Sequence, residues 1–298
     1  HGLTDDLAST TLLAADGPVA IAPSMNPVMW ANPATQANVA TLMQRGIQVW
    51  GPADGDMACG EIGTGRFEEP EDLVARTLAF FAPKPLAGKR ALVTSGPTHE
   101  PIDPVRVMAN RSSGQQGQAI ASALAAAGAE VTLVTGPVNL PQPPGMTVVP
   151  VQTADQMLAA AQAALPADIA VFAAAVADWK PKTTATEKLK KVGGQDELSM
   201  SFVKNPDILA TIAQADHRPA LVVGFAAETE NVVANAQGKL ARKNADWIVA
   251  NDVSGGAVFG EQTNTVTLVS AQEAEAWPTL TKDQVAERMV QKIVESLP

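Results

Sequence analysis

The sequence predicts an α/β protein with a mostly parallel sheet and two domains, and three observations carry this prediction. The chain has 298 residues, enough for two domains with separate cores. In its larger part, short apolar runs alternate with amphipathic helical segments, which is typical of parallel sheets. Residues 82–88 contain two prolines and a glycine, and they interrupt both periodicities. We therefore expect domains at residues 1–85 and 86–298.

The second domain is expected to be Rossmann-like, because its apolar runs and helical segments alternate along most of its length. Asn205-Pro206-Asp207 marks the start of one of its helices. The predicted strands are 90–94, 130–135, 169–174, 220–225, 247–250 and 265–269, and the predicted helices are 116–127, 154–164, 206–213, 232–244 and 282–296.

The first domain is expected to be a partial flavodoxin-like α/β domain. It shows two short strands, at 19–23 and 48–50, and helices at 35–45 and from residue 69 onward. A doubly wound domain usually has about five strands, so we expect this segment to be the second half of one, with the first half absent. Residues 55–66 are glycine-rich and are expected to form a flexible loop that carries Cys59.

The composition excludes several classes of protein. Hydrophobic residues make up 46% of the chain and charged residues 17%, which is typical of a globular protein. The formal net charge of −10 argues against general nucleic-acid binding. No apolar stretch reaches the roughly 18 residues that span a bilayer. The single cysteine, Cys59, excludes an internal disulfide and fits a reducing cytoplasm, and no cysteine or histidine spacing indicates zinc.

A cluster of lysines stands out against the acidic background. Lys180, Lys182, Lys188, Lys190 and Lys191 follow directly after the buried strand predicted at 169–174. A positive loop at the end of such a strand is where an α/β protein can hold a polyphosphate. The alternative is a solvated charged loop, which is the usual fate of a charge run.

Two further segments of the second domain could complete a nucleotide site. Lys239 and Lys243 stand four residues apart and share one helix face, so both could meet Lys188 at one triphosphate. Small residues surround Phe225, which could stack on a base or belong to the core. Taken alone, the spacing of Lys239 and Lys243 favours a solvated helix face over a ligand site.

A serine- and glycine-rich turn before the helix at 116–127 suits a phosphate or carboxylate. It also raises the alternative of a nicotinamide-binding enzyme. Two features count against that alternative: only Gly114-x-x-Gly117 remains of the G-x-G-x-x-G spacing, and the second strand ends in Thr135-Gly136, without the acid that holds a ribose hydroxyl.

Eight motifs occur in one order along the chain, and together they resemble a known family. They are Pro23-x-Met25-Asn26-x-x-Met29, Ala58-Cys59-Gly60-Glu61-x-Gly63-x-Gly65-Arg66, Ser95-Gly96-Pro97-Thr98, Asn110-x-Ser112-Ser113-Gly114, Ala174-Ala175-Val176-Ala177-Asp178, Lys188-x-Lys190-Lys191, Lys204-Asn205-Pro206-Asp207 and Gly224-Phe225-Ala226-Ala227-Glu228-Thr229. The chain resembles the bifunctional family of coenzyme A biosynthesis, in which phosphopantothenoylcysteine decarboxylase is fused to phosphopantothenate–cysteine ligase.

The resemblance implies that the second domain joins 4′-phosphopantothenate to L-cysteine with CTP and Mg²⁺, through an acyl-cytidylate. It implies that Lys188 stabilises charge on the α-phosphate and that Asn110 holds the acyl group of the intermediate. The positions that match CTP contacts are Phe172, Ala173, Ala174, Asp178, Lys188, Pro206, Asp207, Ile208, Leu209, Phe225, Lys239 and Lys243. The metal ligands are not identified.

For the first domain, the resemblance implies an FMN-dependent decarboxylase in the full-length protein. Asn26 matches a substrate-binding position, and Cys59 matches the acid that reduces the enethiol intermediate. The family's catalytic histidine and flavin-contacting motif do not precede His1, so we expect no decarboxylase turnover from this sequence. The family further implies a cytoplasmic homo-oligomer, with dimeric ligase and trimeric flavin domains, that acts on small molecules rather than on nucleic acids or membranes.

Two alternatives from other classes remain open at this point. One is a non-catalytic flavoprotein regulatory subunit, which would bind no nucleotide through its lysine-bearing domain. The other is the NAD(P)-dependent oxidoreductase considered above.

Overall fold

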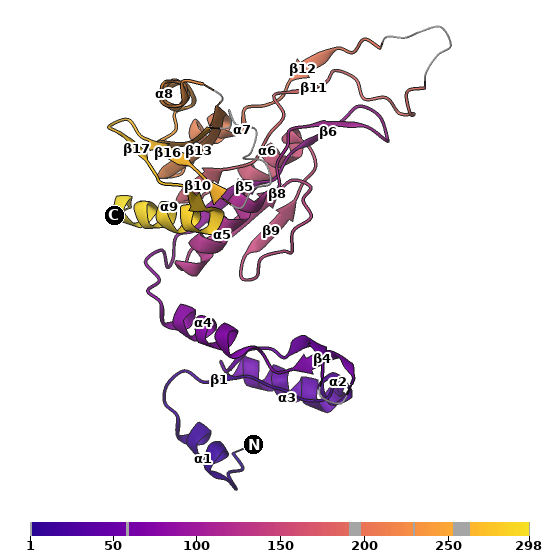
Figure 1. The fold of residues 1–298 in the computed structure, drawn as a ribbon, viewed down its shortest axis with the longest axis vertical. Coiled ribbons are helices and arrows are strands. Elements are labelled where there is room, and N and C mark those ends of the chain that lie inside the picture. The colour runs from indigo at the N-terminus through magenta and orange to yellow at the C-terminus, as the bar shows by residue number, and fades with distance from the viewer. Residues whose placement is uncertain (1, 58–59, 191–197, 229, 253–262, 298) are drawn as a thin grey trace. The chain divides into compact units, whose positions relative to one another are not determined.

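The computed structural model describes residues 2–57, 60–190, 198–228, 230–252 and 263–297, and Figure 1 shows the course of the chain. The chain forms two compact units, His1–Ala82 and Pro83–Pro298, and each is described by itself. Among the described residues, no helix combines the length and the apolar character that crossing a membrane requires.

The first unit is built from short elements. Its two parallel strands β1 and β2 pair through Ala20↔Gln48 and Ile21↔Val49. Asn32 and Glu69 precede prolines that open helices, as expected for proline in a first helical turn. The elements are α1 (Leu7–Ala14), β1 (Ala20–Ile21), α2 (Pro27–Ala31), α3 (Pro33–Gln44), β2 (Gln48–Val49), β3 (Ala53–Asp56), β4 (Ile62–Arg66) and α4 (Pro70–Phe81).

The prediction of a flexible loop at 55–66 was wrong for most of that segment. The strands β3 and β4 form an antiparallel hairpin there, so the described part of this unit has four strands rather than two. Gly65 has φ +157°, and a Cβ at this position would lie 2.1 Å from the carbonyl oxygen of Met25. Glycine is therefore required by close packing inside a strand, a use that strand propensity does not indicate. Cys59 lies outside the described residues.

The second unit contains an eight-stranded sheet in its described part, in the order β17-β16-β14-β13-β10-β5-β8-β9. The six strands from β14 to β9 are parallel, whereas β16 and β17 extend the sheet with antiparallel pairing. The strands are β5 (Arg90–Ser95), β8 (Glu130–Thr135), β9 (Thr147–Pro150), β10 (Ile169–Phe172), β13 (Leu221–Glu228), β14 (Trp247–Asp252), β16 (Val266–Val269) and β17 (Ala274–Ala276). The predicted α/β class with a mostly parallel sheet is confirmed.

Helices cover both faces of this sheet, as Figure 1 shows. Val93 and Val171 pack with α5 (Gln115–Ala126) and α9 (Lys282–Ser296) on one face. Leu92 and Ala170, their neighbours in sequence, pack with α6 (Ala154–Ala163), α7 (Ile208–Ala213) and α8 (Val232–Lys243) on the other. Because successive strand residues point to opposite faces, a strand buried on both sides is apolar throughout.

The strand order reverses between β5 and β10. From β5 the chain builds outward to β8 and β9, and then returns to the other side of β5 to add β10, β13 and β14. Thr94 and Phe172 lie in register at the carboxyl ends of the two central strands. Loops diverge at such a point and leave a crevice, which is where open α/β sheets bind their ligands.

Two hairpins project from the sheet next to this reversal. One joins β6 (His99–Pro101) to β7 (Val107–Ala109), and the other joins β11 (Trp179–Pro181) to β12 (Phe202–Lys204). Figure 1 shows both running away from the sheet on the same side. The short pair β15 (Thr263–Asn264) and β18 (Leu280–Thr281) leads into α9.

Candidate nucleotide-binding cleft

A cleft of about 580 Å³ lies at the reversal of strand order in the second unit. It runs from Thr94 at the end of β5 and Phe172 at the end of β10 to the last residues of β13. The start of α5, the start of α7 and one face of α8 complete its walls. The carboxyl ends of the central strands therefore open into a cavity large enough for a nucleotide.

The start of α5 is packed tightly against the end of β5. Gly114 caps the helix in the left-handed region, at φ 75°, and its carbonyl oxygen accepts a 2.8 Å hydrogen bond from Ser95 Oγ. A Cβ on Gly117 would lie 2.5 Å from that same Ser95 Oγ. These glycines let the first turn of α5 reach the cleft wall, where main-chain N–H groups suit an anion.

Lysine side chains line the α8 side of the cleft. Lys239 and Lys243 both line it, as their i and i+4 positions predict. Lys243 Nζ lies 3.2 Å from Asp207 Oδ2. Asp207 also caps α7, because its Oδ1 accepts a 3.1 Å hydrogen bond from Ala210 N–H. The ammonium group of Lys243 is therefore held near the N-terminus of α7 by Asp207, whose side chain is itself fixed as the helix cap.

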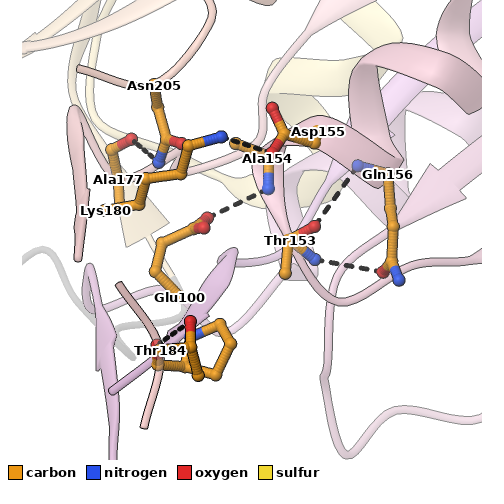
Figure 2. A network of polar contacts seen from close by, with 10 residues as sticks. Glu100, Thr153, Ala154, Asp155, Gln156, Ala177, Lys180, Thr184 and Asn205 are labelled. Atoms are coloured by element: carbon orange, nitrogen blue, oxygen red, sulfur yellow. Dashed lines mark hydrogen bonds and ion pairs between the residues drawn. The ribbon is translucent and has the colours of Figure 1, made fainter. Parts of the chain in front are cut away.

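Several buried amide oxygens of the cleft wall have no hydrogen-bond partner within the described part of the chain. Asn205 is 6% exposed, and its Nδ2 donates a 2.8 Å hydrogen bond to Ala177 O, as Figure 2 shows. Its Oδ1 finds no hydrogen-bond partner among the described residues, and the same holds for the side-chain oxygens of Gln116, Asn251 and Asn264. All four residues line the cleft. Buried acceptors are rarely left unpaired, so these oxygens favour a bound ligand or ordered water here.

A polar network holds the neighbouring elements in place. Glu100, only 1% exposed, accepts a 2.9 Å hydrogen bond from Ala154 N–H at the start of α6. Thr153 and Gln156 form a capping box there, and Lys180 makes an ion pair with Asp155 (Figure 2). Lys180 is therefore engaged by Asp155, and it is not among the residues that line the cleft.

Most of the residues predicted from the sequence lie together in this cleft. Asn110 lines it, and its Nδ2 donates a 2.9 Å hydrogen bond to Val176 O. The other lining residues from the predicted set are Phe172, Ala173, Ala174, Asp178, Pro206, Asp207, Ile208, Leu209, Phe225, Lys239 and Lys243.

Lys188 is the predicted residue that the structure does not bring to the cleft. It is not among the lining residues, and it is exposed between β11 and β12. The segment that carries it lies along the β6–β7 hairpin, because Ala185 N–H donates a 3.0 Å hydrogen bond to Ile102 O. Its expected meeting with Lys239 and Lys243 is therefore not seen in this structure, and its catalytic role stays a prediction. Lys191 lies outside the described residues.

Sequence reasoning missed several residues of the cleft wall. Gln116, Asn264 and Lys282 line the cleft, and Gln116 Nε2 donates a 3.1 Å hydrogen bond to Lys282 O. Asn264 reaches this wall through the antiparallel pairing of β15 with β18. No local pattern marks such a position, since it depends on how a later segment folds back.

In the first unit, Asn26 has a structural role in the described residues. Its Oδ1 accepts a 2.8 Å hydrogen bond from Val28 N–H at the start of α2, and its Nδ2 donates to Glu61. Its substrate contact stays a prediction. Within the described ranges, no group of three or more His, Cys, Asp or Glu side chains is arranged to hold a metal ion.

The fold and the cleft define a two-part α/β protein whose larger unit has a cleft at the reversal of strand order. Two family matches agree with this class. Residues 86–297 match the DNA/pantothenate metabolism flavoprotein C-terminal domain, and residues 1–82 match the family described as Flavoprotein. The larger match covers more than half of the chain.

Relatives narrow this class further. The coenzyme A biosynthesis bifunctional protein CoaBC of Vibrio cholerae is 47% identical over 298 residues, covering 99% of this chain and 75% of the relative. That of Escherichia coli K12 is 46% identical, covering 98% and 73%. The crystal structure of a CoaBC C-terminal domain is 40% identical with a TM-score of 0.60, covering 71% of this chain and 97% of that structure. The chain belongs to the CoaBC family, and it is an enzyme of coenzyme A biosynthesis.

Proposed function

We propose that the second unit joins 4′-phosphopantothenate to L-cysteine at the expense of CTP. In the first step, a carboxylate oxygen of phosphopantothenate attacks the α-phosphorus of CTP, and pyrophosphate leaves. In the second step, the cysteine amine attacks the acyl carbon, loses a proton, and CMP leaves. The product is 4′-phosphopantothenoylcysteine. Family membership favours this reaction over a nicotinamide oxidoreductase or a non-catalytic flavoprotein subunit.

One observation carries the proposal: two lysines of one helix face, the start of α5 and several amide oxygens without partners among the described residues line the same cleft. Lys239 and Lys243 supply positive charge for a triphosphate. The amide oxygens accept hydrogen bonds from a polar ligand. A cleft of about 580 Å³ holds a ligand of nucleotide size together with a second small molecule.

The remaining roles follow from the place of each side chain. Phe225 and the segments 172–174 and 206–209 are assigned to the nucleoside, for which the cleft offers aromatic and main-chain surface. Asn110 is assigned to the acyl group. Asp178 and Asp207 are the carboxylates among the described lining residues, so they are the candidates to hold Mg²⁺ beside the phosphates.

Lys188 retains its proposed role as the cation at the α-phosphate. In the substrate-bound enzyme the exposed Lys188 side chain would bring its ammonium group to the α-phosphate, where it would stabilise the charge that develops as pyrophosphate leaves. Substrate positioning supplies much of the remaining rate, since no side-chain general base is assigned.

The full-length protein is proposed to carry FMN-dependent phosphopantothenoylcysteine decarboxylase as its second activity. The Flavoprotein match over residues 1–82 and the bifunctional relatives support this assignment. Asn26 and Cys59 are its proposed substrate-binding and acid residues. We further propose a cytoplasmic homo-oligomer, and exposed apolar side chains on the projecting hairpins, including Val105 and Trp179, support an interface between copies.

The proposal is tested by a nucleotide screen. Thermal stability is measured with CTP, ATP or NAD in the presence of Mg²⁺, and pyrophosphate release is then followed with phosphopantothenate and cysteine. We expect stabilisation chiefly by CTP, and turnover only with all three substrates. Stabilisation by NAD alone, or an absence of nucleotide binding, would contradict the assignment.

A further inference from the structure

A buried carboxylate of the β6–β7 hairpin holds the segment that carries Lys188. Asp103 is 2% exposed, and it lies 86 positions before Leu189, the residue after Lys188. Asp103 Oδ2 accepts a 3.1 Å hydrogen bond from Leu189 N–H. The contact is long-range, so the turn and the lysine segment fold against each other.

The two carboxylate oxygens of Asp103 accept hydrogen bonds from different parts of the chain. Oδ1 accepts 2.8 Å hydrogen bonds from Val105 N–H and Arg106 N–H, which form the turn itself. Oδ2 accepts from Arg106 Nε at 2.9 Å and from Leu189 N–H. One oxygen therefore shapes the hairpin, and the other reaches across to the lysine segment.

Arg106 closes the opposite side of the same peptide. Its Nη2 donates a 2.6 Å hydrogen bond to Leu189 O, so both main-chain groups of Leu189 are held by the Asp103–Arg106 pair. A second bond joins the same two segments: Thr184 Oγ1 donates to Pro101 O at 3.2 Å, and Figure 2 includes this bond. The lysine segment is thus fixed at its two ends while the Lys188 side chain stays exposed.

The hydrogen bonds to the Asp103 carboxyl favour its ionised form. Burial by itself raises its pKa, but the hydrogen bonds from Val105, Arg106 and Leu189 outweigh burial and hold the pKa well below its usual range. The clamp on the lysine segment therefore carries its negative charge at neutral pH.

We propose that Asp103 is a positioning residue, which fixes the main chain beside Lys188 so that its ammonium group starts from a defined place. This inference rests on the role proposed for Lys188. Because a small misplacement of a reacting group can cost about 100-fold in rate, a residue that never touches substrate can still govern the first step.

The variant that tests this role is Asp103→Asn. An asparagine oxygen can keep the two bonds of the turn, but its NH₂ group would face the donors of Leu189 and Arg106. We expect the kcat for pyrophosphate release to fall about 10- to 100-fold, with little change in KM for CTP. The matched control is Asp246→Asn, because Asp246 Oδ2 also accepts from an arginine, Arg218, and from a main-chain N–H, that of Val222. The control should retain its rate.

A double-mutant cycle with Lys188→Ala separates positioning from general damage. If Asp103 acts through Lys188, adding Asp103→Asn to Lys188→Ala should cost less than about 2-fold in rate. An equal loss in both backgrounds, or no loss from Asp103→Asn alone, overturns the inference. A Lys188→Ala enzyme with the normal rate also overturns it, because no lysine would then need to be placed.

A readout without catalysis keeps this inference distinct from the proposed reaction. Trypsin cleaves after Lys188 only when the main chain around Leu189 opens. Cleavage at this bond, followed by mass spectrometry, should be at least about 10-fold faster in Asp103→Asn than in the parent or in Asp246→Asn. Unchanged cleavage overturns the clamp, whereas absent CTP-dependent turnover with faster cleavage would overturn the proposed reaction and leave the clamp on the lysine segment standing.

Discussion

Lys243 Nζ and Asp207 Oδ2 lie 3.2 Å apart and join the last turn of α8 to the first residue before α7. The Asp207 carboxylate therefore forms an ion pair with the lysine that is proposed to bind a phosphate. Since Asp207 is itself held as a helix cap, the pair keeps the ammonium group aimed at the cleft before any ligand arrives. A phosphate in the cleft would compete with the Asp207 carboxylate for the charge of Lys243.

Removing either lysine of this helix face should weaken CTP binding. Lys239→Ala and Lys243→Ala each delete a charge-assisted contact, and we expect the dissociation constant for CTP to rise about 10-fold or more. Calorimetric titration at two salt concentrations measures the effect and its electrostatic origin. Lys292→Ala is the control, because Lys292 pairs with Glu275 outside the cleft. Unchanged affinity in both cleft variants would contradict the assignment.

Replacing Asp207 by asparagine should release Lys243 without damaging α7. Asparagine caps helices as well as aspartate does, and an exposed ion pair contributes only about 0.2–1 kcal/mol, so stability should change little. Affinity for inorganic tripolyphosphate in the absence of Mg²⁺ should then rise several-fold, because a competing anion is gone. Weaker tripolyphosphate binding by this variant would show that Asp207 does not compete for the lysine.

Two glycine-to-alanine changes should have opposite effects. At Gly117 the new Cβ would lie 2.5 Å from Ser95 Oγ and 2.6 Å from Ser95 Cβ, so we expect a loss of about 1–3 kcal/mol in unfolding free energy. At Gly238, inside α8, a new methyl group would have no atom within 4 Å, and alanine there should add about 0.5–1 kcal/mol through helix propensity. Chemical denaturation of both variants measures the difference, and a stabilised Gly117→Ala would refute the tight packing of α5.

The ion-pair cluster on α9 should make stability depend on pH. Lys292 first, and Arg288 second, lower the pKa of the Glu275 carboxyl by hydrogen bonding to it. A depressed folded-state pKa stabilises the fold above the unfolded value of about 4.3, and this contribution disappears as the pH falls through the folded value. Glu275→Gln should therefore lower Tm by about 2 °C at neutral pH and leave Tm unchanged in strong acid. Scanning calorimetry at several pH values checks this, and an equal deficit at every pH would rule out the ionic cause.

The buried strands could be predicted from the sequence, but the edge strands could not. β5 is continuously apolar from Ala91 to Val93 because both of its faces are covered. β9 and β17, at the two ends of the sheet, are only partly buried, and neither was predicted. The β3–β4 hairpin was not predicted for another reason. Its glycines allow close contacts in the fold, but strand propensity counts glycine against a strand.

The residues of the cleft likewise divide into those that the sequence could place and those that it could not. Lys239 and Lys243 could be placed together because helical spacing is a local property. Asn264 could not, because its position depends on the pairing of β15 with β18. Lys188 shows the limit of motif reasoning: the residue can be recognised in the sequence, but its place follows from Asp103, a contact between distant segments.

The packing of α9 bears on how the chain folds during its synthesis. α9 contributes Val285, Met289 and Ile293 to a core that it shares with Ile120 and Leu124 of α5. More than 150 positions of the chain separate these two helices. Until residues 282–296 have left the ribosome, the apolar side of α5 and the strands beneath it stay exposed to solvent. We expect the nascent second unit to depend on chaperone shielding over this interval, because long-range contacts form late and exposed apolar surface promotes aggregation.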